Sequence, residues 1–284
     1  MKLLDGKVVK KKILEELREE VLKLKRKPGL VVIQVGDDPA SKVYVGQKEK
    51  MATSVGYNFQ HIKFDENIEE NIIEDKIIEL NNDDNVDGIL VQMPLPQQLN
   101  SKKIQNLINQ YKDVDGLSDI NSGMLTHNVD TLVPCTPKGI MDILEYYDIP
   151  VSGKNVVIVG RSDLVGKPLA SLMLNANATV TVCHSKTVNL GEITSKADIL
   201  IAAVGKASLI TKDMVKENSV VIDVGINRIN DKLCGDVDFN DVIDKVSYIT
   251  PVPGGVGQMT VAELGKNVLK AYKSREKQKK LEKK

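Results

Sequence analysis

The chain has few cysteines and few histidines, and these shortages exclude several kinds of chemistry. Its three cysteines, Cys135, Cys183 and Cys234, stand far apart in 284 residues, without CxxC spacing. An odd and scattered set argues against a disulfide framework and against a zinc site, and it favours a reducing, cytoplasmic environment. The histidines occur in unrelated contexts, with neither a Ser-His-Asp pattern nor metal-ligand spacing. We therefore expect a protein that holds no metal.

An excess of charge and a long apolar run are also missing. The 39 Lys and Arg residues balance 39 Asp and Glu residues, which leaves no electrostatic attraction for nucleic acid or an anionic membrane. Asp5, Gly6 and Lys7 interrupt any signal peptide, and no apolar run reaches membrane-spanning length. Only the ending KSREKQKKLEKK is strongly basic, which is typical of a solvated helix end. We expect neither a nucleic-acid nor a membrane partner.

Helix-like and strand-like segments alternate along the chain. In the first half, helical patterns separate short apolar segments that predict strands at 30–36, 57–64 and 86–92. In the second half, strands are predicted at 155–160, 178–185, 197–205 and 219–225, and a last helical pattern begins at Thr260. Strands that alternate with helices predict an α/β fold of two domains, the second a Rossmann-type, doubly wound parallel sheet.

Several residues predict where elements begin and end. Asp38 followed by Pro39 is typical of an N-cap with proline at the first helical position, and Gly56 is a plausible C-cap for that helix. The segment VPCTPKG, residues 133–139, holds two prolines and a glycine. We expect it to be the connector into the second domain.

A glycine-rich turn directly follows the strand at 155–160. Gly160, Ser162 and Gly166 lie between that strand and a helix, where backbone N–H groups and the helix dipole can face a pyrophosphate. The pattern is GxSxxxG and not GxGxxG, so a turn that binds nothing is the alternative.

The end of the next strand distinguishes between cofactors. NAD sites place an acidic residue there for the ribose 2′-hydroxyl, but this chain has Cys183, His184, Ser185 and Lys186. With Arg161 in the glycine-rich turn, such a pocket suits a 2′-phosphate. The sequence therefore favours NADP.

Three polar side chains share one face of the helix that follows Asp38. Ser41, Tyr44 and Lys48 stand at i, i+3 and i+7, where a hydroxyl, a phenol and an amine could relay protons. Such a stripe is more often solvated surface. Gln92 ends a predicted strand, where a parallel sheet presents its ligands, and Asp115 stands in KDVDG, which also reads as an ordinary turn.

Taken together, these segments resemble the bifunctional methylenetetrahydrofolate dehydrogenase/cyclohydrolase family over nearly the whole chain. The segments that carry the resemblance are VGDDPASKVYVGQK, VQMPLPQQL, KDVDGL, PCTPKGI, GRSDLVGKP, CHSKT, IDVGIN, GDVDF and TPVPGGVGQMT. One departure is Gln258, where the family usually carries proline. It returns an N–H group to the glycine-rich loop at 250–258.

The resemblance implies two reactions on one site. NADP oxidises 5,10-methylenetetrahydrofolate to the methenyl cation, and hydrolysis then gives 10-formyltetrahydrofolate, within one-carbon metabolism and purine biosynthesis. By motif position, Lys48 is the catalytic acid or base, Gln92 positions it, Tyr44 stacks on the folate, Ser41 assists and Asp115 holds the pterin. A carboxylate can accept the two adjacent pterin donors as a forked pair.

The resemblance also assigns the remaining contacts. Pro253, Gly254 and Gly255 would line the folate site, and NADP would contact Gly160, Arg161, Ser162, Gly166, Ser185 and Ile226. The expected domains are a catalytic domain at 1–134, completed by a C-terminal helix at 259–284, and an NADP-binding domain at 135–258. A homodimer is implied as well.

Other readings remain open from the residues. The enzyme could lack the cyclohydrolase step, although Tyr44, Lys48 and Gln92 are all present. It could reduce another small carbonyl compound on the same fold, as shikimate dehydrogenase does. It could also be an NADP-binding regulator without activity.

Overall fold

The computed structural model describes residues 2–230 and 232–282. The chain forms two compact units, Met1–Lys11 with Thr136–Thr260, and Lys12–Cys135 with Val261–Lys284. We call them the six-stranded unit and the three-stranded unit after their main sheets. The expected first domain began at residue 1 and the expected C-terminal helix ended at residue 284, and these ends lie outside the described residues.

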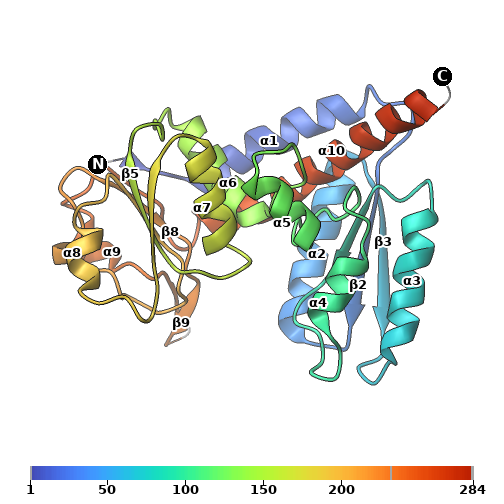
Figure 1. The fold of residues 1–284 in the computed structure, drawn as a ribbon, viewed down its shortest axis with the longest axis horizontal. Coiled ribbons are helices and arrows are strands. Elements are labelled where there is room, and N and C mark those ends of the chain that lie inside the picture. Colours follow the sequence, from blue (N-terminus) through green and yellow to red (C-terminus); the bar gives the residue numbers. More distant parts are fainter. Residues whose placement is uncertain (1, 231, 283–284) are drawn as a thin grey trace. The chain divides into compact units, whose positions relative to one another are not determined.

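The six-stranded unit contains a parallel sheet with strand order β1-β11-β8-β7-β5-β6 (Figure 1). Its strands are β1 (Lys2–Leu3), β5 (Asn155–Val159), β6 (Thr179–Cys183), β7 (Ile199–Ala202), β8 (Val220–Asp223) and β11 (Tyr248–Ile249). Its helical segments are α6 (Cys135–Tyr146), α7 (Gly166–Asn175), α8 (Leu190–Thr194), α9 (Phe239–Val242) and the 3₁₀ turns η1 (Lys212–Met214) and η2 (Val256–Gln258). A small antiparallel hairpin joins β9 (Asn227–Ile229) to β10 (Lys232–Cys234). This order confirms the predicted Rossmann-type sheet.

The three-stranded unit has a parallel sheet in the order β3-β2-β4. Its strands are β2 (Gly29–Val35), β3 (Asn58–Phe64) and β4 (Gly88–Val91). Its helices are α2 (Pro39–Val55), α3 (Glu70–Asn82), α4 (Ser101–Leu107), α5 (Asp119–Thr126) and most of α10 (Met259–Glu282), while α1 (Gly6–Val21) has residues in both units. Ile73, Ile77 and Ile104 of α3 and α4 pack into the core beside β2. Figure 1 shows the strands lying between α2 and α3.

Local signals in the sequence predicted the ends of α2. The Asp38 side chain accepts the N–H of Ser41 at 2.7 Å, and Pro39 is the first helical residue. Gly56 closes the helix in the left-handed conformation, with φ of 90°. All three expectations are confirmed.

Several elements were not predicted from the sequence, among them α6, β1 and β11. Helix α6 begins at Cys135, inside the expected connector. Pro137 does not prevent this, because it falls in the first turn, where its missing N–H costs no helical bond. Strands β1 and β11 are two residues long, which is too short for a periodic pattern in the sequence. Their pairing with each other and with β8 stabilises them. No helix among residues 2–230 and 232–282 is long and apolar enough to cross a membrane.

A buried aspartate connects α10 to the sheet of the three-stranded unit. Asp87, just before β4, has no exposed surface and accepts hydrogen bonds from Arg26 at 2.6 and 2.7 Å and from Arg275 of α10 at 3.0 Å. It also accepts the N–H of Gly29 at 2.9 Å. Two guanidinium groups and the start of β2 therefore depend on one carboxylate.

Removal of this carboxylate should destabilise the fold strongly. We expect Asp87→Ala to lower the free energy of unfolding by about 3–5 kcal/mol, because two arginines lose their buried partner. Urea denaturation measures the change. As a control, Asp84→Ala removes a carboxylate that is 74% exposed and also pairs with Arg275, and it should cost much less than Asp87→Ala. Equal losses in the two variants would contradict this account.

Candidate active site

Lys48 of α2 and Gln92, which follows β4, form a hydrogen-bonded pair. The Lys48 Nζ donates to Gln92 Oε1 at 2.6 Å, and Gln92 Nε2 donates to the carbonyl oxygen of Met93 at 2.6 Å. The second bond fixes which end of the amide faces the lysine. Gln92 is only 7% exposed, whereas Lys48 is half-buried. The structure thus brings together two predicted site residues that are 44 positions apart in the sequence.

Asp115 lies close enough to Lys48 for their charges to interact. Burial lowers the pKa of Lys48, while the attraction of Asp115 opposes this shift. Burial raises the pKa of Asp115 to about 6, against the attraction of Lys48 and with a small contribution from Asp113. An amine that loses its proton more easily than usual therefore stands near a carboxyl group that ionises less easily than usual. Such groups exchange protons more readily than the same side chains in water.

The other aspartate of KDVDG organises the loop that carries Asp115. Asp113 is 2% exposed and accepts the N–H groups of Gly116 at 3.1 Å and Ser118 at 2.9 Å, together with the Asn121 side-chain amide at 2.9 Å. These bonds hold the chain around Gly116, whose φ is +69°. The division of roles between the two aspartates was not predictable from their spacing.

Asn267 and Cys135 are further residues near this site that the sequence did not indicate. The Asn267 side chain donates to the carbonyl oxygens of Val114 at 2.9 Å and Val133 at 2.8 Å, so α10 holds the Asp115 loop. Cys135 is 4% exposed, and its Sγ lies 3.6 Å from the Val114 carbonyl oxygen. Burial and then Asp115 raise the pKa of this thiol, which keeps it protonated. The segment VPCTPKG, which contains Cys135, had predicted only a connector between the domains.

The helical stripe that contains Lys48 is not a uniformly solvated face. Ser41 is 3% exposed, and its Oγ lies 3.5 Å from the Met93 carbonyl oxygen, beside the backbone that Gln92 contacts. Tyr44 is 48% exposed, one turn before Lys48. The stripe thus offers a buried hydroxyl, a half-buried amine and an aromatic ring that is open to a ligand.

The loop at 250–258 belongs to the six-stranded unit, whereas Lys48, Gln92 and Asp115 belong to the other unit. Gly254 accepts the N–H of Gly6 at 3.0 Å, and Gly255 donates to Pro251 at 2.8 Å. The N–H of Gln258 donates to Gly255 at 3.1 Å, a bond that needs a residue with an amide hydrogen. Pro253, the third residue of the predicted folate contact, lies between these anchored positions.

The glycine-rich turn stands at the carboxyl edge of the six-stranded sheet. Gly160 follows β5 with φ of +135°, and a Cβ there would lie 2.2 Å from the Ala203 carbonyl oxygen. A Cβ on Gly166 would lie 2.2 Å from the Gly160 carbonyl oxygen, so α7 begins directly against the turn. The Ser162 Oγ accepts the N–H of Val165 at 3.2 Å, and Arg161 is exposed. These features fit a bound dinucleotide phosphate, since backbone can approach the ligand closely.

The remaining predicted cofactor contacts lie at the same edge. Ser185 is exposed two residues after β6, and no carboxylate follows that strand before it. Ile226 is 55% exposed three residues after β8. The first turn of α7 contains no acidic residue. These positions therefore place no carboxylate where a 2′-phosphate is expected.

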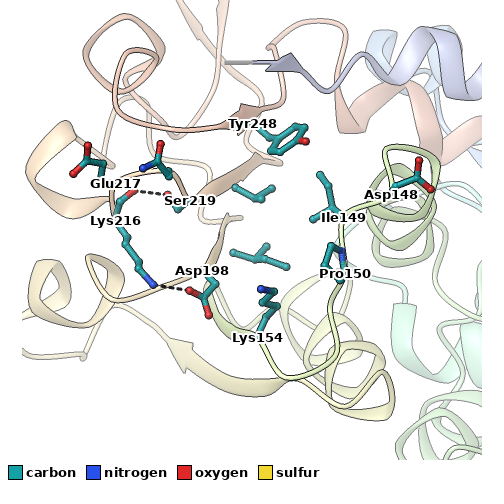
Figure 2. Close-up of a pocket in the computed structure, with 12 residues that line it drawn as sticks. Asp148, Ile149, Pro150, Lys154, Asp198, Lys216, Glu217, Ser219 and Tyr248 are labelled. Atoms are coloured by element: carbon teal, nitrogen blue, oxygen red, sulfur yellow. Dashed lines mark hydrogen bonds and ion pairs between the residues drawn. The ribbon is translucent and has the colours of Figure 1, made fainter.

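A cavity of about 370 Å³ in the same unit lies at the opposite edge of the sheet (Figure 2). It is lined by residues where β7 and β8 begin and by a Lys216–Asp198 ion pair at 2.6 Å. Ligands of open parallel sheets bind at the carboxyl edge, so this cavity is not the candidate site. Within the described residues, no group of three His, Cys, Asp or Glu side chains could hold a metal ion.

Comparison with known proteins gives matches over nearly the full length. The family model for the tetrahydrofolate dehydrogenase/cyclohydrolase catalytic domain matches residues 4–115, and the model for the NAD(P)-binding domain of that family matches residues 134–276. The bifunctional protein FolD of Campylobacter hominis is 52% identical over 279 residues, which cover 97% of this chain and 98% of that protein.

Solved structures agree with these matches. The bifunctional FolD methylenetetrahydrofolate dehydrogenase/cyclohydrolase of Campylobacter jejuni superposes with a TM-score of 0.95 at 48% identity, covering 97% of this chain and 99% of that one. The Trypanosoma brucei FolD, in complex with NADP and an inhibitor, superposes with a TM-score of 0.91 at 36% identity, covering 95% and 97% of the two chains.

The coupling between Asp115 and Lys48 is measurable in the free protein. We expect Asp115→Asn to lower the pKa of Lys48 further, because the variant loses the charge that favours the ammonium form. Side-chain NMR titration of the lysine detects this, and Asp119→Asn, at an exposed position, is the matched control. A Lys48 pKa that stays constant or rises in Asp115→Asn would contradict the coupling.

The raised pKa of Asp115 also predicts the sign of a stability change. Its folded value of about 6 lies above the ordinary 3.8, so the fold favours the protonated carboxyl group. The free energy of unfolding should therefore fall as the pH rises from about 4 to about 6. Asp115→Asn should lack this part of the pH dependence in urea titrations.

Proposed function

The chain belongs to the tetrahydrofolate dehydrogenase/cyclohydrolase family, and we propose that Lys48, positioned by Gln92, moves the protons in its reactions. The enzyme oxidises 5,10-methylenetetrahydrofolate to 5,10-methenyltetrahydrofolate with NADP and hydrolyses the product to 10-formyltetrahydrofolate. The observation that carries the proposal is the 2.6 Å bond between Lys48 and Gln92, at an amine whose pKa burial lowers.

Hydrolysis is the step that needs a proton carrier. Water must lose protons as it adds to the methenyl carbon, and the departing ring nitrogen must gain one. A neutral lysine accepts the first proton, and the resulting ammonium group returns one to the nitrogen. The bond that Nζ donates to Gln92 holds the amine in place, and the cationic intermediate would lower its pKa further. Asp115 opposes that shift, so the amine keeps access to both protonation states.

Asp115 is our proposed anchor for the folate. Its carboxylate can accept the adjacent ring N–H and amino groups of the pterin as a forked pair, once it is ionised above about pH 6. The exposed ring of Tyr44 would stack on the folate, and Ser41 would support the backbone at Met93. Pro253, Gly254 and Gly255 are proposed as further folate contacts.

NADP supplies the acceptor for the hydride of the first step. We propose that the turn Gly160–Gly166 holds its pyrophosphate, that Arg161 and Ser185 bind the 2′-phosphate, and that Ser162 and Ile226 complete the contacts. An arginine suits a phosphate because its planar fork donates two parallel hydrogen bonds.

Three wider expectations accompany this function. The catalytic domain is proposed to comprise 1–134 with 259–284, and the NADP domain 135–258. The protein is proposed to work in the cytoplasm as a homodimer, within one-carbon metabolism that supports purine synthesis. Light scattering of the purified protein would give its mass relative to 31.3 kDa for one chain.

Loss of the Lys48 amine should nearly abolish hydrolysis. We expect Lys48→Met to lower the cyclohydrolase rate by about 10²–10⁴, because the proton carrier is gone, while NADP still binds. Dehydrogenase activity should fall as well, through poorer positioning of the folate. The measurement is methenyltetrahydrofolate hydrolysis after subtraction of the uncatalysed rate, with circular dichroism to verify the fold.

A neighbouring lysine provides the control for this change. Lys50 lies on the same helix and is exposed, so Lys50→Met should leave both activities near the parental values. If Lys48→Met hydrolyses methenyltetrahydrofolate at close to the parental rate, Lys48 does not carry the protons.

The 2′-phosphate contact gives a second test. Arg161→Ala should weaken NADP binding by about 1.5 kcal/mol, about tenfold, which is the low end for a charged bond because Arg161 is exposed. Calorimetry with NADP measures the change, and binding of NAD should change much less. Lys154→Ala, at the opposite edge of the sheet, is the control. An unaltered NADP affinity in Arg161→Ala would remove Arg161 from the site.

A further inference from the structure

The carboxyl edge of the six-stranded sheet contains two buried aspartates for which the reactions give no role. Asp223 is the last residue of β8 and is 4% exposed, and Asp236, between β10 and α9, is fully buried. Charged side chains are rarely buried unless several partners stabilise them. Their partners are therefore informative.

Asp236 gathers four hydrogen-bond donors around one carboxylate. Its Oδ2 accepts the backbone N–H groups of Val204 at 2.7 Å and Gly205 at 3.0 Å, and its Oδ1 accepts that of Lys206 at 2.8 Å. Oδ1 also accepts the side-chain amide of Asn227 at 3.0 Å. Successive backbone N–H groups that converge on one anion form the kind of concavity that binds phosphates. Here a carboxylate of the protein itself fills it.

Asp223 fixes the backbone on which Asp236 stands. Its carboxylate accepts the N–H groups of Asp236 at 2.9 Å, Val237 at 3.0 Å and Gly225 at 3.1 Å. The segments IDVGIN and GDVDF are thereby joined across the sheet edge. Three loops meet through the two carboxylates, after β7, after β8 and before α9.

Two glycines leave room for these carboxylates. A Cβ on Gly225 would lie 2.1 Å from Asp236 Oδ1, and a Cβ on Gly235 would lie 1.7 Å from Asp223 Oδ2. No other residue fits at either position without displacement of a carboxylate. The sequence thus provides each buried acid with an adjacent glycine from the opposite segment.

The joined loops stand where one end of the cofactor is expected. The sheet order β8-β7-β5-β6 places β7 and β8 on one side of the turn after β5, and β6 with Ser185 on the other. If the 2′-phosphate lies at β6 and the pyrophosphate at β5, the nicotinamide reaches the loops after β7 and β8. Those loops present two exposed apolar side chains, Val204 at 37% and Ile226 at 55%.

We propose that Asp236 is a positioning residue for the nicotinamide half of NADP. By holding the backbone of Val204–Lys206 and the side chain of Asn227, it fixes Val204 and Ile226 as an apolar surface for the nicotinamide ring. The inference rests on the proposed location of NADP at this edge. It assigns Val204 as a cofactor contact and gives GDVDF a role in hydride transfer.

The two activities of the enzyme separate this role from a general structural one. Hydride transfer needs a correctly placed nicotinamide, whereas methenyltetrahydrofolate hydrolysis consumes no NADP. Loosening of the loops should therefore damage the dehydrogenase and spare the hydrolysis when NADP is left out of the assay. Partial unfolding would damage both.

The test is Asp236→Asn, which keeps the size of the side chain but replaces one acceptor oxygen by an NH₂ group. That group faces N–H donors which the carboxylate had accepted. We expect the Kd for NADP, from calorimetry, to rise by about 10–100-fold, and dehydrogenase kcat/KM for NADP to fall by a similar factor. Hydrolysis without NADP should stay within about twofold of the parent. Asp238→Asn is the matched control, because Asp238 caps α9 through the N–H of Asp241 and asparagine caps a helix equally well.

If Asp236→Asn does not fold, a milder variant tests the positioning role of Asp236. Asn227→Ala removes one of the four donors at a half-buried position, and it should weaken NADP by about 3–10-fold, again with hydrolysis preserved. Parental NADP affinity in a folded Asp236→Asn would overturn the proposal, and so would equal losses of the two activities.

The Arg161→Ala result identifies which premise has failed. If Arg161→Ala weakens NADP but folded Asp236→Asn does not, the cofactor location stands and the positioning role is wrong. If neither variant weakens NADP, the cofactor does not lie at this edge, and the inference falls with its premise.

Discussion

Parallel pairing of the strands is the constraint on which both sites depend. In a parallel sheet the carboxyl ends of all strands meet at one edge, so residues that follow different strands become neighbours without being close in sequence. Gln92 follows β4 in the three-stranded sheet, while Gly160, Ser185 and Ile226 follow β5, β6 and β8 in the other. Every pair within these two sheets is parallel. The positions of the proposed site residues are therefore set by the order of the strands, and not by local motifs alone.

Buried aspartates then shape the loops at those edges. Asp113 folds the KDVDG loop by accepting the N–H groups of Gly116 and Ser118, which leaves Asp115 available to a ligand. Asp236 does the same for the loop after β7. A carboxylate suits this task because it accepts several short, charge-assisted bonds at once and can replace the ladder bonds that a loop lacks. In both places a buried acid orders a loop whose residues we propose to contact a ligand.

The residues that we propose to be catalytic show how burial and charge act in opposition. Burial lowers the pKa of Lys48 and raises the pKa of Asp115, but each group favours the charged state of the other. The result is a pair of groups whose proton affinities lie closer together than those of free side chains. Gln92 adds orientation without adding charge, since its amide oxygen accepts a hydrogen bond from Lys48 Nζ at 2.6 Å. A proton carrier needs both a suitable pKa and a fixed position.

The sequence by itself determined the local structure and much of the chemistry. Periodic apolar residues predicted the α/β alternation, Asp38 and Gly56 marked the ends of α2, and the missing acid after Cys183 favoured NADP. The tertiary structure alone decided which residues meet. It gave the geometry of the Lys48–Gln92 bond, which the resemblance had implied only in name, it made Asp113 the acceptor that folds the loop of Asp115, and it placed Asn267 of the last helix against that loop. These contacts join residues far apart in the chain or depend on which way a loop turns, and residue periodicity reports only the face of an element and never its partner.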